Sequence, residues 1–557
     1  MKRDFSSLTG RQFDVLVCGG GIYGAWTAFD AALRGLSVAI VEQGDWASAT
    51  SSASSKLIHG GLRYLETYDF KLVRKALAER QMLLSMAPHR VWPLRFGVPI
   101  YTDSRIGALR LKAGLTLYDF LARLSGKNLA GSDIEHRHFD RNAFAGRFPA
   151  LESEGLKGGF TYGDAQTDDA RLVLELIAGA MEAGAVCVNY CKLTGLNEAK
   201  GLVYGATVRD QLTGTDALIR TKQIVNTTGL WLAASNKGRK WCRLTKGIHL
   251  VMAGTLTNGV LNDEALLLTA KSDGRVFFMI PWYGMTLIGT TDTDYKGDLD
   301  QVSVEPKDIA YLLAEANHYL KTAWTEKDVV GSYAGLRVMK RSGKASPSSV
   351  SRDWELKTAA NGVHYSIGGK LTSSREDASQ IVDAVCAAKG ATTPCATKNR
   401  PFPWAPDEEF SEWSATVTAQ ASRCGLDPES AKWLIRRHGK RAGEVLRSME
   451  SDPRLAERIV PALPFIYADV LFCARNEMVI HLDDLLRRRM PLLIMARLDE
   501  NMLHRIAGIV APVMGWDEAA IASEIEACRS QTCPAIQSNR ATSCAIKGIP
   551  SLMDNLR

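Results

Sequence analysis

With 557 residues, the chain is long enough to bury a large core and form two or three domains, and its hydrophobic content of 46% is ordinary for a soluble globular protein. No stretch approaches the roughly 20 apolar residues of a membrane span, and residues 1–12 lack the apolar core of a secretory signal. The net charge of +7 is modest for this length, so we expect a cytoplasmic protein that binds no nucleic acid, although the charge would suit an anionic substrate or membrane surface.

Residues 14–42 read as a buried strand, a glycine turn, an apolar helix and a second buried strand. Gly19, Gly21 and Gly24 fill the pattern G-x-G-x-x-G, with Gly20 between the first two. Glu42 ends the second strand about 20 residues later, where a carboxylate can accept hydrogen bonds from a ribose diol. The start of the helix offers free N–H groups and a positive dipole end to phosphates. This pattern predicts a dinucleotide site rather than a merely structural glycine turn.

A block rich in serine and glycine, residues 47–64, follows this unit directly. Such a composition is also typical of a flexible linker, but the position favours a loop that lines the diphosphate and a flavin ring. The predicted cofactor residues here are Thr50, Ser51, Ser52, Ser55, Lys56, Leu57, His59 and Gly60. Arg63 and Tyr64, at the end of the block, are predicted to face the substrate.

Two amphipathic basic segments come next. In residues 70–86 the apolar side chains recur at helical spacing with lysines and arginines between them, and residues 106–124 show the same pattern. Each is predicted to be a helix packed on the core. The alternative for the second segment is a helix that lies on an anionic membrane surface.

The middle of the chain alternates between strand and helix patterns. Asp168 and Asp169 offer an N-terminal cap to a helix over residues 170–181, and the strand of residues 224–226 runs into a turn at Gly229, a further predicted cofactor residue. A helix is predicted from Pro306. The other predicted strands are residues 186–189, 203–209, 217–221, 247–251, 265–269, 275–280, 285–289, 329–337 and 363–367.

The last of these strands leads into a glycine turn, residues 368–372, and a helix. Gly369, Leu371 and Thr372 are predicted to contact the flavin, whose reduced form would be stabilised by the start of a helix. Beyond Pro403 the sequence becomes helical and charged. Eleven scattered cysteines without a CxxC pair indicate reduced thiols, with neither a disulfide framework nor a metal site.

Together these motifs resemble the FAD-dependent glycerol-3-phosphate dehydrogenases, over roughly residues 13–528. The motifs that carry the resemblance are residues 19–24, 49–66, 168–172, 288–292 and 368–372, with 467–470 and 483–489 in the helical region. The resemblance implies an α/β fold with a Rossmann-type FAD-binding domain, a mixed β-sheet substrate domain and a C-terminal all-α domain. The expected domains are residues 1–105, 155–240 and 335–400 for FAD, 106–154 and 241–334 for the substrate cap, 401–530 for the helices, and a disordered tail, 531–557.

The family also implies an activity and a set of site residues. Glycerol 3-phosphate is oxidised at C2 by hydride transfer to flavin N5, and the electrons pass to quinone, in many members at one membrane leaflet. The residues that match the family's active-site positions are Arg63, His249, Arg337, Arg352 and Lys370. Guanidinium groups suit a phosphate monoester, and a histidine titrates in the range needed to take the hydroxyl proton. We therefore assign His249, Arg337 and Lys370 to catalysis, and Arg63, Tyr64, Arg337, Arg352 and Lys370 to the substrate.

Several positions depart from the family pattern. Leu230 replaces a proline or alanine, Val338 replaces a proline, and Ser373 and Ser374 stand where threonine and tyrosine are common. Loss of that aromatic side chain predicts a wider pocket. Other polyol phosphates such as erythritol phosphate, an oxidase of hydroxy or amino acids, and a flavin-binding protein without catalysis therefore remain alternatives. A homodimer is also compatible with the sequence.

Overall fold

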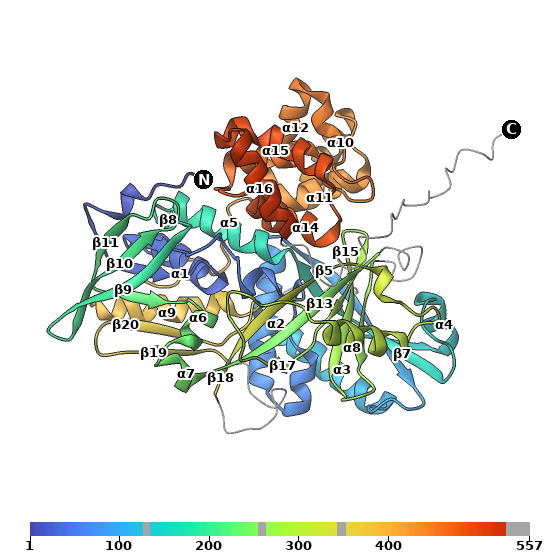
Figure 1. Cartoon of the computed structure of the whole chain (residues 1–557). Helices are drawn as coiled ribbons and strands as arrows, with labels where there is room; N and C mark the ends of the chain where they lie inside the picture. The colour runs from blue at the N-terminus through green and yellow to red at the C-terminus, as the bar shows by residue number, and fades with distance from the viewer. Residues whose placement is uncertain (126–133, 254–262, 342–352, 531–557) are drawn as a thin grey trace.

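The structure, a computed structural model, describes residues 1–125, 134–253, 263–341 and 353–530. The predicted substrate residue Arg352 and the predicted disordered tail, 531–557, lie outside the described residues. Figure 1 shows a Rossmann-type unit on the left, a large β-sheet unit on the right, and a cluster of C-terminal helices above both.

The Rossmann-type unit is built on a six-stranded sheet with the order β19-β20-β12-β2-β3-β8. Strand β2 (Val15–Cys18) is buried along its whole length and pairs in parallel with β3 (Val38–Val41) and β12 (Ile224–Asn226). Continuous apolar runs of this kind are typical of parallel strands that are covered on both faces. The remaining strands are β8 (Val186–Val188), β19 (Glu355–Thr358), which is antiparallel, and β20 (Val363–Ile367).

Each face of this sheet has its own cover. On one face, side chains such as Val15 and Val17 pack against the three helices α1 (Ile22–Leu33), α5 (Asp169–Glu182) and α9 (Ser374–Ala388). On the other, Leu16 and Cys18 pack against a four-stranded sheet of order β1-β11-β10-β9. Its strands are β1 (Gln12–Phe13), β9 (Cys191–Ala199), β10 (Leu202–Asp210) and β11 (Asp216–Thr221).

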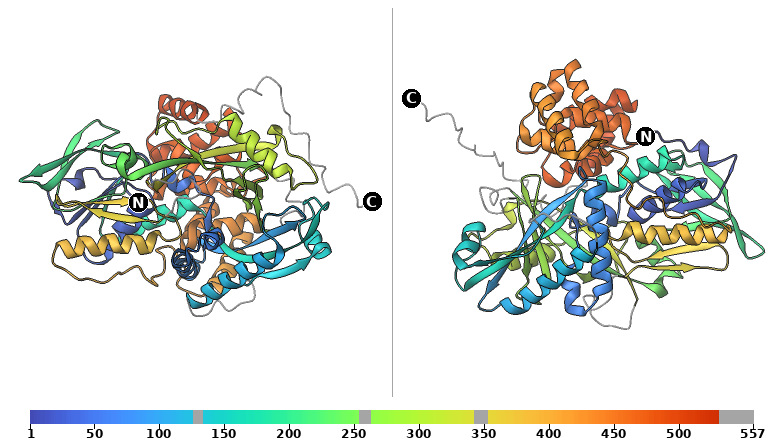
Figure 2. Two further views of the ribbon diagram at one scale, coloured as in Figure 1. Left: turned by 90° about the horizontal axis from the view of Figure 1, so that it is seen from below. Right: turned by 180° about the vertical axis from the view of Figure 1, so that it is seen from behind.

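The second unit is a mixed sheet of ten strands with the order β17-β13-β16-β15-β14-β5-β7-β4, to which β18 and β6 are added through β13 and β7. Its long strands β13 (Cys242–Met252) and β18 (Val329–Lys340) are antiparallel and extend toward the Rossmann-type unit. The other elements are α2 (Phe70–Met86), α3 (Ala108–Leu124), α4 (Arg141–Arg147), α8 (Pro306–Asn317), β4 (Leu57–Ile58), β5 (Val91–Tyr101), β6 (Arg137–Asp140), β7 (Leu156–Thr167), β14 (Ala265–Thr269), β15 (Val276–Trp282), β16 (Met285–Gly289) and β17 (Thr293–Asp294). Figure 2 shows α2 and α3 beside this sheet.

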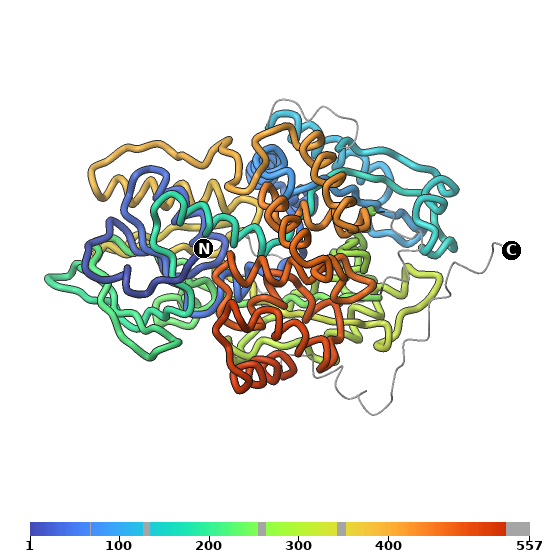
Figure 3. The backbone as a smooth tube through the Cα atoms, turned by 90° about the horizontal axis from the view of Figure 1, so that it is seen from above, coloured from blue at the N-terminus to red at the C-terminus, as the bar shows by residue number. Residues whose placement is uncertain are grey.

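The C-terminal part of the described chain is helical. Seen from above, its helices lie over the junction between the other two units, with the N-terminus beside them (Figure 3). The helices are α10 (Phe410–Arg423), α11 (Pro428–His438), α12 (Ala442–Ser451), α13 (Tyr467–Asn476), α14 (Leu492–Met495), α15 (Glu500–Met514) and α16 (Glu518–Ser530), with a π-helical turn at Asp484–Arg489. Among the described residues, none of the helices is both long and apolar enough to cross a membrane.

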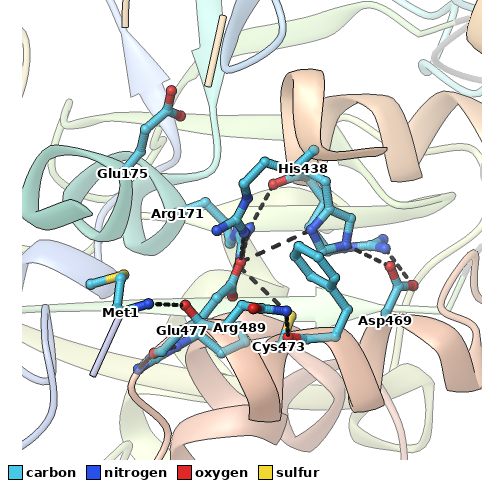
Figure 4. A network of polar contacts seen from close by, with 12 residues as sticks. Met1, Arg171, Glu175, His438, Asp469, Cys473, Glu477 and Arg489 are labelled. Atoms are coloured by element: carbon cyan, nitrogen blue, oxygen red, sulfur yellow. Dashed lines mark hydrogen bonds and ion pairs between the residues drawn. The ribbon is translucent and has the colours of Figure 1, made fainter. Parts of the chain in front are cut away.

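A buried network of charges joins these helices to the Rossmann-type unit (Figure 4). Arg171 on α5 makes a two-pronged ion pair with Glu477, which also binds Arg441. Behind it, His438 contacts Asp469 at 2.8 Å. The two arginines hold the pKa of Glu477 well below its usual value despite burial, so the carboxylate is charged in the folded state. The charges compensate one another at a junction from which water is excluded.

The structure confirms most of the predicted elements and adds several that the sequence analysis missed, among them β5, β6, β9, β19 and α4. The helix predicted over residues 70–86 and the strand over 265–269 have the expected bounds. The 11-residue strand β5 was not predicted because it contains Pro93 and Pro99, which normally argue against a strand. On one side, β5 is paired with β14 only at Phe96 and Gly97. Pro93 and Pro99 lie outside this short pairing, where the edge of β5 that faces β14 makes no ladder hydrogen bonds with any described strand.

Candidate active site

Two cavities of about 300 Å³ each meet at the start of helix α1. The first lies over the ends of β2, β3 and β12, and the second runs below the large sheet toward β13 and β18. The residues that line both are Gly21, Thr50, Ser51, Thr227 and Gly229. A long molecule with phosphates at its middle would therefore place those phosphates at the helix start.

The glycine turn explains how the backbone comes so close to this junction. Gly19 has φ +110°, and a Cβ there would lie 2.7 Å from the carbonyl oxygen of Thr227. A Cβ at Gly24 would overlap the carbonyl oxygen of Gly19, so the helix packs against the strand only with glycine at this position. Ser51 Oγ accepts a hydrogen bond of 2.9 Å from the Ile22 N–H at the first turn of α1. The turn and the serine block thus form one cradle.

Glu42 lines the first cavity, but its carboxylate is already engaged by the backbone. It accepts hydrogen bonds from the N–H groups of Gly20 (2.6 Å) and Gly44 (3.0 Å). Burial raises the pKa of Glu42, and these two N–H groups oppose that effect. The carboxylate therefore fixes the turn, and its contact with a ribose stays a prediction.

The predicted cofactor residues divide into two groups. Those that line one of the two cavities are Gly19, Gly21, Glu42, Thr50, Ser51, Ser55, Leu57, His59, Gly229, Gly369, Leu371 and Thr372. Gly20, Gly24, Ser52, Lys56 and Gly60 do not line them. Lys56 is buried behind the wall, where its ammonium pairs with Asp169 at 2.6 Å.

Gly60 also has a role different from the one the sequence predicted. Its N–H donates to Asp164 at 3.2 Å, and a side chain there would overlap Tyr118 and Leu77. Asp164 further accepts from Arg80 and from the Tyr118 hydroxyl. The missing side chain therefore makes room for α2 and α3 rather than for a ligand.

His249 lies in the wall of the second cavity, on strand β13. Its ring is stacked on that of Tyr333, its cross-strand neighbour on β18, with centroids 4.8 Å apart. Nε2 lies 2.9 Å from Ser55 Oγ, and Nδ1 has no hydrogen-bond partner among the described residues. Burial, then the charges of Arg337 and Lys56, hold the pKa of His249 well below its usual value. The imidazole is therefore neutral near pH 7.

Arg337 reaches the same cavity from β18, opposite Thr245 of β13. Its guanidinium donates to Thr290 Oγ1 at 2.6 Å and to the Thr291 carbonyl oxygen at 2.9 Å. A side chain at Gly247 would overlap this guanidinium, so the glycine keeps its path open. Two bonds to the wall aim a planar cation into the cavity.

Lys370 enters from the other side, on the turn before α9. Its Nζ lies 3.6 Å from the ring centroid of Tyr64, and both residues line the second cavity. The backbone N–H of Lys370 donates to the Tyr23 hydroxyl at 3.0 Å, and that hydroxyl donates to Asp377 at 2.6 Å. Tyr23 therefore ties the lysine turn to helices α1 and α9.

The structure thus brings His249, Arg337, Lys370 and Tyr64 together, but not all of the predicted set. Arg63 lines a neighbouring cavity beside α3 instead, and Arg352 lies outside the described residues. Sequence reasoning missed Tyr23, Tyr333 and Thr290. All three carried a signal: Tyr23 and Thr290 lie within the motifs of residues 19–24 and 288–292, and Tyr333 lies within the predicted strand of residues 329–337 that also contains Arg337.

Comparison with known proteins agrees with this geometry. The family described as FAD dependent oxidoreductase matches residues 14–375, and the C-terminal domain of alpha-glycerophosphate oxidase matches residues 395–521. A glycerol-3-phosphate dehydrogenase of Synechocystis sp. is 35% identical, over 94% of this chain and 97% of its own length. The aerobic glycerol-3-phosphate dehydrogenase of Bacillus subtilis is 33% identical, over 93% of this chain and 94% of its own.

A solved structure extends the comparison to the cofactor. The glycerol-3-phosphate dehydrogenase of Bacillus halodurans, complexed with FAD, is 28% identical and has a TM-score of 0.75, over 94% of this chain and 95% of its own. The two joined cavities, with a glycine cradle between them that side chains would fill, fit such an extended dinucleotide. The chain therefore belongs to the family of FAD-dependent glycerol-3-phosphate dehydrogenases, and it is an FAD-dependent oxidoreductase.

Proposed function

We propose that the protein oxidises sn-glycerol 3-phosphate to dihydroxyacetone phosphate. The observation that carries the proposal is a neutral, buried histidine in the wall of a cavity that two cations also line, His249 with Arg337 and Lys370. The names of the similar proteins support the choice of substrate. When bound, FAD supplies the hydride acceptor, flavin N5.

The chain's own task is to take the proton that the C2 hydroxyl loses with the hydride. His249 is suited to it because a neutral imidazole has a nitrogen lone pair to offer, whereas an imidazolium has none. Ser55 Oγ lies 2.9 Å from Nε2 and holds the ring in place; its hydroxyl can donate to or accept from that nitrogen, so the contact suits either tautomer. Arg337 and Lys370 stabilise negative charge that develops on the oxygen as the proton moves. General-base catalysis of this kind contributes about 10²- to 10⁴-fold.

The phosphate of the substrate needs cations that are held in place. Arg337 offers a planar fork fixed by Thr290 and Thr291, and Lys370 offers an ammonium fixed over the Tyr64 ring. The same two residues are also proposed to act at the reacting oxygen, where negative charge develops only as the proton leaves. Arg352 remains a predicted third contact.

We further propose that the electrons pass to quinone at a membrane surface. Beside the active site, a cavity of about 490 Å³ lies between residues 62–70 and helix α3, with apolar walls that include Leu65, Ile106 and Leu117. Around it, large apolar side chains are exposed, among them Leu109 at 86% and Phe120 at 55%. Arginines on the same helix would favour an anionic leaflet. These features support a peripheral position on the cytoplasmic face.

The test of the substrate is anaerobic mixing of the FAD-loaded enzyme with glycerol 3-phosphate, followed by absorbance near 450 nm, where oxidised flavin absorbs. We expect rapid bleaching with glycerol 3-phosphate and none with glycerol, and a large loss of the rate in Arg337→Ala and Arg352→Ala. Erythritol phosphate is the matched alternative substrate. If erythritol phosphate bleaches the flavin and glycerol 3-phosphate does not, the substrate is erythritol phosphate. If no polyol phosphate bleaches the flavin, the proposal is refuted.

A further inference from the structure

A third cavity, of about 380 Å³, lies where the three units of the fold meet. The Rossmann-type unit contributes residues 43–53 and Lys192, β18 contributes residues 333–336, and the C-terminal helices contribute Arg487 and Ile494. None of the catalytic candidates His249, Arg337 and Lys370 lines it. It is therefore distinct from the cavity in which the oxidation is proposed.

Arg487 differs from the two arginines that follow it. Arg488 and Arg489 both bind Asp45, each with a contact of 2.6 Å, and Arg488 also binds Asp484. Arg487 makes no hydrogen bond, ion pair or aromatic contact with any residue that the structure describes. Its guanidinium instead lines the cavity. Of the three consecutive arginines, Arg488 and Arg489 are paired with carboxylates, whereas Arg487 lines the cavity.

A charged guanidinium that loses water without gaining an ion-pair partner costs free energy of folding, and a bound anion would offset that cost. Arg487 is partly exposed, unlike Arg488 and Arg489, which are buried. Partial burial lowers the pKa of Arg487, and the charge of Asp483 opposes that effect. Buried charges in folded proteins are paired, because an unpaired one loses its hydration without compensation. A neutral side chain of similar length at position 487 would avoid the free-energy cost of removing a charge from water. A partly buried guanidinium that lines a cavity and has no hydrogen-bond partner among the described residues can be completed by an anion in that cavity.

The walls indicate what kind of anion would fit. Lys192 adds a second cation whose ammonium has no partner among the described residues, and Gln43 and Gln211 add amides. Asp300 also lines the cavity, and its carboxylate accepts a hydrogen bond of 3.1 Å from Trp231 Nε1. We propose that this cavity is a second anion site that binds a phosphate monoester between Arg487 and Lys192. A guanidinium fork with one ammonium suits a dianionic group with several acceptor oxygens.

An anion bound in this site would change how tightly the protein holds its cofactor. The loop of residues 43–50 separates the third cavity from the first, and Gln43, Ser48, Thr50, Lys192 and Trp231 line both. A ligand held by Arg487 would tie this shared wall to the C-terminal helices. By linkage, an anion that binds the FAD-loaded protein more tightly than the FAD-free protein stabilises the loaded form and slows the release of FAD.

The experiment measures FAD release from the holoenzyme by the rise in flavin fluorescence, with inorganic phosphate or chloride at equal ionic strength. We compare the wild type with Arg487→Gln, with Arg487→Lys, which keeps the charge, and with Arg497→Gln, which removes an exposed charge from the same domain. The active-site cations are unchanged in all four proteins, so phosphate bound there contributes equally to each. A malonate series tests a dicarboxylate in place of phosphate.

We expect phosphate to slow FAD release in the wild type and in Arg497→Gln. Arg487→Gln should need about 10- to 100-fold more phosphate for the same effect, because a charged hydrogen-bond donor is lost. Arg487→Lys should fall between them. Equal phosphate dependence in all four proteins would overturn the site, and so would a response to malonate but not to phosphate. Faster release in Arg487→Gln without any phosphate effect in the wild type would show that Arg487 serves FAD directly, which also overturns it.

Discussion

The hydroxyl group of Tyr23 joins three elements at the active site, and its removal gives a sharp test of the geometry. The hydroxyl accepts from the Lys370 N–H and donates to Asp377, a buried carboxylate on α9. Burial, then the charge of Asp377, raises the pKa of Tyr23 well above its usual value, so the hydroxyl keeps its proton. Tyr23→Phe deletes both hydrogen bonds and leaves the ring in place.

The expected cost follows from what remains around Asp377. A hydrogen bond to a charged group contributes about 1.5–3 kcal/mol. Asp377 retains Lys75 Nζ at 2.6 Å and Ser373 Oγ at 3.1 Å, so it is not left unpaired. We therefore expect the lower end of that range, about 1.5 kcal/mol of unfolding free energy, together with a slower flavin reduction because the lysine turn loses its anchor.

The assay has two parts. Denaturant unfolding of the holoenzyme gives the free-energy change, and anaerobic stopped-flow mixing with glycerol 3-phosphate gives the reduction rate. Tyr204→Phe is the matched control, because Tyr204 is 47% exposed. We expect Tyr204→Phe to match the wild type in both measurements. If Tyr23→Phe also matches the wild type in unfolding free energy and in reduction rate, its hydroxyl does not hold the lysine turn and the reasoning is refuted.

Three further predictions concern the base and the domain junction. His249→Gln should lower the rate of flavin reduction about 10²- to 10⁴-fold with little change in the affinity for glycerol 3-phosphate, and unchanged kinetics would exclude His249 as the base. Asp45→Asn removes the partner of Arg488 and Arg489 and should cost about 3–5 kcal/mol of unfolding free energy, which thermal and denaturant unfolding can measure. The pKa of buried His438 is lowered to about 4, below its unfolded value of about 6.5, so its contribution is present above pH 6.5 and is lost as the pH falls from there toward 4. Unfolding midpoints of the wild type and His438→Gln between pH 4 and 8 check this, and the two curves should converge at the acid end.

Local patterns predicted the fold well because they depend on short stretches of chain. The glycine turn, the strands that flank it and Glu42 are all contained within 29 residues, and their geometry follows from backbone space and burial. Such patterns predicted the dinucleotide-binding unit and the helical C-terminal part, whereas the mixed-sheet substrate domain was implied by the family resemblance. Strand β5 was missed because the sequence cannot show that its prolines face a nearly unpaired edge.

The site was harder to predict because its contacts join distant parts of the chain. Tyr23 meets Lys370 across 347 positions and Asp377 across 354. The tyrosine lies within the glycine motif of residues 19–24, but that motif does not show which distant groups its hydroxyl contacts. Lys56 was placed in the cofactor wall because it follows the serine run, but a carboxylate 113 positions away draws it into the interior. Position in a motif thus predicts that a residue is near the site, not which way it points.

The arginine run at residues 487–489 shows why the C-terminal helices belong to the oxidoreductase rather than being an appendage. Asp45 lies three residues beyond Glu42, on the loop that walls the first cavity, and it is fully buried. Burial opposes its charge, but the two arginines that bind it lower its pKa to about 2, so the carboxylate is charged near neutral pH. If that loop moved away from the cofactor, the carboxylate of Asp45 would lose both ion pairs and Arg489 would lose its carboxylate partner, whereas Arg488 would keep Asp484. The helical domain therefore limits the opening of the nucleotide site through charge pairing, and Arg487, one residue earlier on the same turn, is placed to sense what enters beside it.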